Sequence, residues 1–321
     1  MNNHRSLVAL GASLLLGACA TTARLEPRAG PSPEPKQDYS PQGLFGEAHG
    51  DFVAVMDRYR PQVQGSFMLE PGSRLDDEPG DFDMWRLLAD GRVPLVIDPD
   101  SVLLVGGRTE AKRFDFKSDM RGLQDETVGS IGLEIGYGRF INEDTYAYAT
   151  FQPGVYSDFD GTLTSEDWEF FGESLVTFRY NDNVFYKGGV RVSKDFPDLP
   201  IFPLVGASWL LDDQWRVDVL LPKRAEISYQ PQPATTVYGG LELEGQEYRV
   251  RAPNGNRSDW NQQELRLYIG AIQRFDDHLS AFARFGSAIA GKHIFRNPAG
   301  VRVDGQLEPV VLFEVGVGWD F

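Results

Sequence analysis

The chain has 321 residues, enough for one large β domain or two ordinary domains. Its formal net charge of −16 and sequence pI of about 4.7 argue against nucleic acid as a partner, because nucleic acid binds basic surfaces. The mean hydropathy is −0.32 and no apolar run of about 18 residues follows the amino terminus, which excludes a helical membrane protein. A β-barrel remains compatible, because its strands are apolar on one face only.

The amino terminus has the pattern of an export signal. Arg5 supplies a positive charge, residues 7–16 form a short apolar core, and small residues follow. The chain's single cysteine, Cys19, comes directly after Leu16-Gly17-Ala18. This string resembles the lipobox of bacterial lipoproteins. The resemblance implies diacylation of Cys19 and, because Ala20 follows, sorting to the outer membrane; the alternative is a chance cysteine beside an ordinary signal peptide.

Three segments precede the clear strand patterns. Residues 1–18 are predicted to be a lipoprotein-type signal peptide. Residues 19–44 are rich in proline and polar residues without periodicity, which predicts a disordered tether. Residues 45–98 are ambiguous between short helices and strands, and we expect an irregular segment. It would serve either as a plug inside the following domain or as a periplasmic cap beneath it.

From about Ser101 the sequence alternates between strand patterns and turn signals. In residues 166–180, Trp168, Phe170 and Phe178 share one face and oppose Glu169 and Glu173. Such alternation indicates strands with one apolar and one polar face. The predicted strands are 101–116, 128–140, 144–157, 166–180, 183–194, 201–211, 214–221, 223–230, 234–250, 263–275, 278–291 and 308–321.

The connections between these strands are of two alternating kinds. Short turns lie at 142–144, 181–183, 212–213, 231–233 and 276–277. Longer loops lie at 117–127, 158–165, 195–200, 251–262 and 292–307, with one short link near Pro222 and Lys223. If the chain runs up and down, the short turns fall at one end and the long loops at the other. Outer-membrane barrels have this asymmetry and an even strand number. We therefore predict an all-β, antiparallel, up-and-down transmembrane barrel of about 12 strands over residues 99–321.

The last strand, Glu308 to Phe321, carries a wholly apolar row on one face, formed by Val311, Phe313, Val315, Val317, Trp319 and Phe321. Glu314, Gly316, Trp319 and Phe321 resemble the terminal signal of outer-membrane barrels. The resemblance implies that the barrel-assembly machinery reads this strand and that it closes against the first strand, for which we expect Ser101–Phe116. Its apolar row is predicted to face lipid.

The middle stretch, FPLVGASWLLDDQWRVDVLLPKRAEISYQ, resembles a bacterial family of uncharacterised outer-membrane β-barrels. The resemblance covers roughly residues 100–321. It implies the fold and a location in the outer membrane of a Gram-negative-type bacterium, and it implies no activity. The lipobox departs from this pattern, because most integral barrels carry an ordinary cleavable signal.

Two patterns that could carry catalysis are set aside. The string Asp158-Phe159-Asp160-Gly161-Thr162 resembles the first motif of haloacid-dehalogenase-type phosphatases, whose nucleophile follows a buried parallel strand. Residues 145–155 interleave polar residues and contain Pro153-Gly154, so we interpret the string as an acidic outer loop. A hydrolase pair of His293 and Ser287 is also disfavoured, because six residues along a strand exceed hydrogen-bond reach. We expect no enzyme activity, no catalytic residues, no metal and no cofactor.

Charged residues on the polar faces of the strands are the better functional candidates. A charge facing lipid near the bilayer midplane costs about 2–4 kcal/mol for Arg or Lys, so these side chains should line the lumen. Either they form a pore that passes a small solute, or they pair with one another in a non-conducting structural or surface-interaction barrel. The candidates are Glu134, Glu173, Lys187, Arg191, Arg216, Glu226, Arg266, Arg284 and Glu314.

Overall fold

The structure is a computed structural model, and it describes residues 61–76, 78, 80–98, 100–117, 123–193, 200–251, 257–296 and 301–321. The predicted signal peptide and tether, including Cys19, lie outside these residues. Within the described part, no helix is long and apolar enough to cross a membrane.

The described residues form fifteen strands and one short 3-10 helix, η3, at Ser165–Asp167. The strands are β1 Gln62–Ser73, β2 Phe82–Asp98, β3 Ser101–Phe116, β4 Glu126–Asn142, β5 Thr145–Ser157, β6 Trp168–Asn181, β7 Val184–Val192, β8 Ile201–Leu210, β9 Trp215–Leu221, β10 Arg224–Gln232, β11 Thr235–Arg251, β12 Arg257–Arg274, β13 Leu279–Arg296, β14 Arg302–Gln306 and β15 Val310–Asp320.

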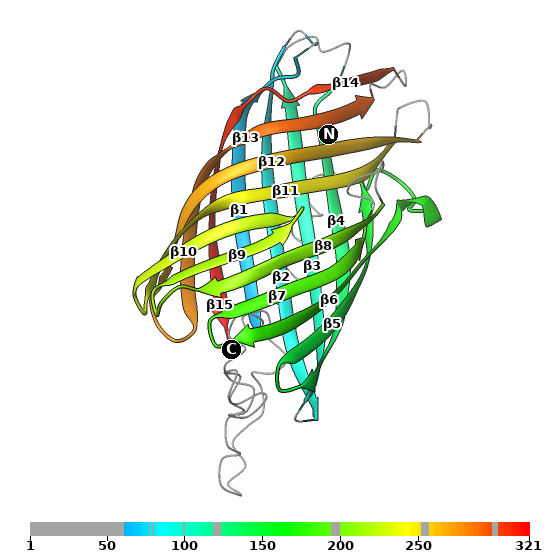
Figure 1. Cartoon of the computed structure of the whole chain (residues 1–321). Helices are drawn as coiled ribbons and strands as arrows, with labels where there is room; N and C mark the ends of the chain where they lie inside the picture. Colours follow the sequence, from blue (N-terminus) through cyan, green and yellow to red (C-terminus); the bar gives the residue numbers. More distant parts are fainter. Residues whose placement is uncertain are drawn as a thin grey trace, which may run out of the picture.

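Fourteen of these strands close into one antiparallel barrel (Figure 1). Each strand from β1 to β13 pairs with the next, β13 pairs with β15, and β15 returns to β1 with Gln62 opposite Asp320. The short β14 pairs only with the upper part of β13 and stands at the rim. Closure gives every barrel strand a partner on both sides over at least part of its length, as a sheet that spans a membrane requires.

The predicted strand number and the predicted start of the barrel are wrong. The structure has 14 barrel strands instead of about 12, because β1 and β2 occupy part of the segment for which we expected an irregular plug or cap. The barrel therefore begins at Gln62, not near residue 99. The closing neighbour of the terminal strand is β1, and Ser101–Phe116 is the third strand of the barrel. The other twelve strands agree with the predicted ranges to within a few residues at most boundaries.

The predicted sorting of connections is confirmed. The turns that join β4 to β5, β6 to β7, β8 to β9, β10 to β11 and β12 to β13 are short and lie at the end where β1 begins and β15 finishes. The longer connections lie at the opposite end, where the link between β9 and β10 at Pro222-Lys223 is the short exception. An even strand number brings both ends of the barrel wall to the short-turn end (Figure 1).

Side chains alternate between an exposed outer face and a covered inner face. In β6, Trp168, Phe170, Val176 and Phe178 are exposed, whereas Glu169, Phe171, Glu173, Leu175 and Thr177 are buried. In β15, Val311, Phe313, Val317, Trp319 and Phe321 are exposed, and Glu314 is buried. The outer surface is thus an apolar band, as the alternation predicted.

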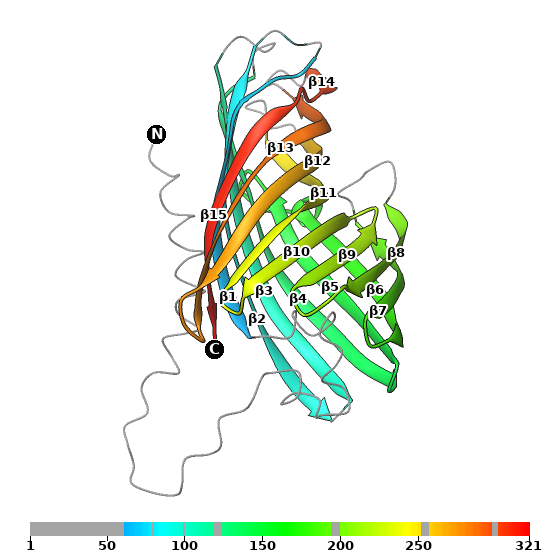
Figure 2. The ribbon, with the colours of Figure 1, turned by 60° about the vertical axis from the view of Figure 1, so that its left-hand side comes forward.

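The barrel wall is uneven in height. The hairpin of β9 and β10 is short, and β10 pairs with β11 only as far as Arg224 opposite Glu242. The upper part of β11 meets β5 from across the barrel instead, through a parallel bridge between Arg249 and Ser157. Figure 2 shows the short hairpin ending well below the tops of β11 and β12. This bridge brings β5 and β11 into contact at the long-loop end of the barrel.

Two apolar clusters occupy the interior. One gathers rings near the long-loop end, where Phe82, Phe114, Phe116, Trp260 and Phe295 pack with centroid separations between 5.0 and 6.2 Å. The other lines the inner faces of β3 to β9 and includes Leu104, Tyr146, Phe185, Leu204 and Leu220. Between and below these clusters lie charged side chains.

Candidate functional site: the charged interior

The nine predicted lumen residues all sit at inner-face positions of their strands. Glu173, Lys187, Arg266 and Glu314 are buried, and the other five are partly exposed. The structure divides eight of them into two clusters. A central group near β11 and β12 contains Arg266, Arg284, Glu314 and Glu226. A second cluster along β6 to β9 contains Glu173, Lys187, Arg191 and Arg216. Glu134, on β4, has no ion pair among the described residues.

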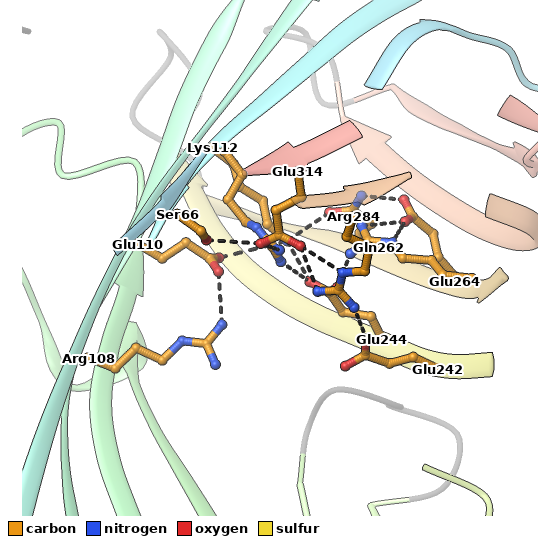
Figure 3. Close-up of polar contacts among 12 residues, drawn as sticks. Ser66, Arg108, Glu110, Lys112, Glu242, Glu244, Gln262, Glu264, Arg284 and Glu314 are labelled. Carbon is orange, nitrogen blue, oxygen red and sulfur yellow. Dashed lines mark hydrogen bonds and ion pairs between the residues drawn. The ribbon is translucent and has the colours of Figure 1, made fainter. Parts of the chain in front are cut away.

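Contacts of the central group cross the interior between opposite parts of the wall (Figure 3). Arg86 on β2 places Nη1 2.7 Å from Glu244 Oε1 on β11 and Nη2 3.1 Å from Glu314 Oε1 on β15. Lys112 on β3 donates to Gln262 Oε1 on β12 at 3.1 Å. These strands are not neighbours in the sheet, so the contacts cross the interior.

The carboxylate of Glu314 has several donors. Glu314 accepts from Ser66 Oγ at 2.9 Å and from Arg284 Nε and Nη2 at 3.0 and 2.6 Å. Arg284 also donates to Glu242 Oε2 at 2.8 Å. A buried carboxylate is tolerated only when it is paired in this way, because the cost of removing it from water is otherwise several kcal/mol.

A second branch of the group surrounds Glu264. Arg266 Nη2 lies 2.6 Å from Glu264 Oε2, and His293 Nε2 lies 2.9 Å from Glu264 Oε1. Arg266 also contacts Glu244, and Tyr248 OH donates to Glu110 across the barrel. Apart from Glu244, these side chains are almost wholly buried, so at this level protein atoms fill much of the interior.

The second cluster joins the short β9–β10 hairpin to the inner faces of β6, β7 and β8. Asp218 accepts from Lys187 Nζ and Ser208 Oγ, both at 2.6 Å, and has Arg216 and Arg224 at 3.6 Å. Glu173 on β6 pairs with Lys223 at 3.0 Å and with Arg191 at 3.3 Å, and accepts from Tyr148 OH. Here cations outnumber the carboxylates that hold them.

Several residues of the interior escaped the sequence reasoning. Glu70 and Arg86 lie on the two strands that were not recognised. Arg108, Glu110 and Lys112 lie on β3, whose pattern is the least regular. Their spacing of two residues is nevertheless a usable signal, because it places three charges of mixed sign on one face of a strand.

The residues of the two patterns that we set aside as catalytic make hydrogen bonds that hold the fold together. Asp158 follows β5, which is antiparallel to both neighbours, and its carboxylate accepts from the backbone N–H of Arg251 and of Asp160. It thereby ties the β5–β6 connection to the top of β11. His293 is buried against Glu264, whereas Ser287 Oγ donates to the carbonyl of Val310 at 2.8 Å. No group of three or more His, Cys, Asp or Glu residues in the described ranges could hold a metal ion.

A family model described as "Domain of unknown function (DUF6268)" matches residues 101–297. The chain belongs to this family. The matched range begins where the family resemblance noted in the sequence begins, at the third strand of the barrel, and it ends before the last strand, β15. Membership of the DUF6268 family assigns no activity. No curated protein matches the chain in sequence.

Solved structures similar to this member of the family are outer-membrane β-barrels. A Pseudomonas aeruginosa FadL homologue matches with a TM-score of 0.47 and 12% identity, covering 88% of this chain and 94% of its own. An outer membrane channel from Pseudomonas putida F1 matches with a TM-score of 0.47 and 10% identity over 82% and 96%. The KdgM porin gives a TM-score of 0.35 and 12% identity over 81% and 99%. At these values, nothing of those proteins' activities passes to this chain.

Proposed function

We propose that this protein is an outer-membrane β-barrel that lets small solutes pass through a narrow, charged interior. The observation that carries the proposal is the contrast between its two faces. The outer face is an apolar band interrupted by few charges, whereas the inner face is charged and in part exposed to water, as at Arg108 and Arg224. The apolar outer face is compatible with contact to lipid, and the charged inner face is compatible with the passage of a hydrated solute.

A second candidate is a non-conducting structural or surface-interaction barrel. The cross-barrel pairs between Arg86 and Glu244 and between Lys112 and Gln262 favour it, as does the layer of aromatic rings near the long-loop end. In this case the charges satisfy one another and the outer loops contact a partner. The two candidates share the membrane location and differ in whether ions cross.

Single-channel recording in planar lipid bilayers separates the two candidates. We expect small, discrete openings from the full chain purified in detergent, because the central group narrows the interior without spanning all of it. Heat-denatured protein in the same detergent is the control. If folded protein gives no openings over repeated insertions, solute passage is wrong and the non-conducting barrel stands.

Membrane insertion has its own test. We expect the protein to stay with the outer membrane after a carbonate wash and to migrate differently on a gel with and without boiling, because a closed barrel resists detergent. Release by the wash would contradict insertion.

We also propose that Cys19 is acylated and that the assembly machinery recognises β15 through Trp319 and Phe321, both exposed on the outer face. Incorporation of labelled palmitate, lost in Cys19→Ala, tests the anchor. Cross-linking of a photoreactive residue at position 319 to the assembly machinery tests the recognition.

A further inference from the structure

Six ion pairs of the barrel interior share one order, in which the cation is more exposed than its carboxylate; Glu244 and Glu242 have the opposite order, because each is more exposed than the cations that contact it. In three of the six the carboxylate is covered and the cation is exposed. Arg108 is 50% exposed beside Glu110 at 0%, Arg224 is 48% exposed beside Asp218 at 8%, and Lys223 is 37% exposed beside Glu173 at 5%. Arg191, Arg216 and Arg284 are likewise more exposed than the carboxylates they pair with, Glu173, Asp218 and Glu314.

The exposure of these cations arises inside the barrel. Arg108 is on the inner face of β3, since it shares that face with buried Leu104 and Glu110, and Figure 3 shows its guanidinium inside the barrel, joined to Glu110 at the edge of the central group. Arg224 is opposite Glu242 in the register of β10 and β11, on the inner face of that hairpin. Water therefore reaches the interior at this level, and the most exposed charges of the interior ion pairs are the guanidinium groups of Arg108 and Arg224 and the ammonium group of Lys223.

The donors of Arg108 and Arg224 are only partly used. Arg108 donates through Nη2 to Glu110 at 3.0 Å, and Arg224 approaches Asp218 no closer than 3.6 Å. A guanidinium carries five N–H donors in a planar fork that matches carboxylate and phosphate oxygens. The interior also carries the partly exposed carboxylates Asp90, Glu134, Glu226, Glu242 and Glu244, each less exposed than Arg108 and Arg224. Arginine holds two of them, Arg284 for Glu242 and Arg86 and Arg266 for Glu244.

We propose that the interior selects anions, and that the solutes it passes carry carboxylate or phosphate groups which exchange between Arg108, Lys223 and Arg224. The inference rests on the proposed solute passage and names its substrate class. The buried carboxylates hold the cations in place, and the cations give the water-filled part of the lumen a positive potential. Cationic linings of this kind favour anions in pores. The chain's overall charge of −16 does not predict this local sign.

The test is the reversal potential across a planar bilayer under a potassium chloride gradient. We expect the full chain to prefer chloride over potassium. The double substitution R108Q/R224Q should lower the chloride-to-potassium permeability ratio several-fold. It should still fold, because Glu110 retains Lys112 at 3.7 Å and Asp218 retains Lys187 at 2.6 Å. Arg139→Gln, which removes an exposed arginine at the short-turn end of β4, is the matched control and should leave the ratio unchanged.

Added succinate and inorganic phosphate then identify the group that binds. Each should reduce the chloride current of the native chain, and the current block should weaken several-fold in R108Q/R224Q; the stronger blocker distinguishes a carboxylate from a phosphate solute. Channels that open but prefer potassium, or a ratio insensitive to the double substitution, would overturn anion selection while leaving solute passage intact. Absence of any openings would instead overturn the proposed function, and the inference with it.

Discussion

Arg266 neutralises two carboxylates in the middle of the barrel. Its guanidinium contacts Glu264 from one side and Glu244 from the other, and its side chain is buried. Removing one partner from a buried ion pair leaves an uncompensated charge in a medium that solvates it poorly. The neighbouring cations Arg86 and Lys112 contact Glu244, so part of that charge stays balanced, whereas Glu264 retains His293 and the side-chain amide of Gln262.

We therefore expect Arg266→Met to lower the free energy of unfolding by about 3–5 kcal/mol, the range for breaking a buried ion pair. Urea titration of the gel-mobility difference between folded and boiled protein measures it. Arg139→Met, on an exposed arginine, is the control and should change the same quantity by less than about 0.5 kcal/mol. Equal effects of the two substitutions would show that the central group does not stabilise the barrel.

Asp158 offers a second test at the level of a single side chain. Its carboxylate accepts from the backbone of Arg251, and the Arg251 side chain in turn donates to the carbonyl of Thr162 at 2.8 Å. Asp158→Ala should release the β5–β6 connection from β11 and make residues 158–167 more sensitive to protease in intact vesicles. Asp213→Ala, in an exposed short turn, should leave the cleavage pattern unchanged. Unaltered protection in Asp158→Ala would contradict this role.

The terminal strand needs one glycine for a steric reason. A Cβ at Gly316 would lie 2.6 Å from the backbone oxygen of Gly65 on β1 and 2.3 Å from the ring of Phe282 on β13. Both neighbours of β15 thus approach it closely at this point. The glycine of the predicted assembly signal is consequently also a packing requirement of the seam between the first and last strands.

Gly316→Ala should lower the free energy of unfolding by about 1–3 kcal/mol, because the added methyl group forces a backbone shift. Gly188→Ala on β7 is the matched control, since no atom lies within 4 Å of the added Cβ there. The same urea titration compares the two. A Gly316→Ala barrel as stable as the Gly188→Ala barrel would contradict the close approach.

The sequence was informative where each strand kept one polar and one apolar face, as in β6 and β15. It failed at β2, where buried Phe82 and Met84 turn inward to the aromatic layer while Trp85 and Leu87 take outward positions. With apolar residues on both faces, the two-residue period disappears. Pairs that cross the barrel, such as Arg86 with Glu244, could not be predicted either, since strand periodicity gives the face of a side chain and not its distant partner.

At the scale of the whole molecule, 14-strand closure predicts that β1 and β2 are indispensable. Deleting residues 61–98 would leave β3 and β15 as open edges, with the row of backbone donors and acceptors that a membrane cannot satisfy. We expect no heat-modifiable species from this variant after refolding into detergent, with the full chain as control. A folded barrel of 12 strands from the deletion would contradict the closure observed here.

The seam between β1 and β15 has a consequence for the order of folding. Around the ring, every other neighbouring pair is joined by a connection of modest length, whereas Gln62 and Asp320 are separated by nearly the whole wall. Local hairpins form before distant segments meet, because bringing the ends of a long chain together carries a large entropic cost. The barrel should thus assemble as a growing curved sheet with two exposed edges. Its slowest step is the search of the last strand for the first.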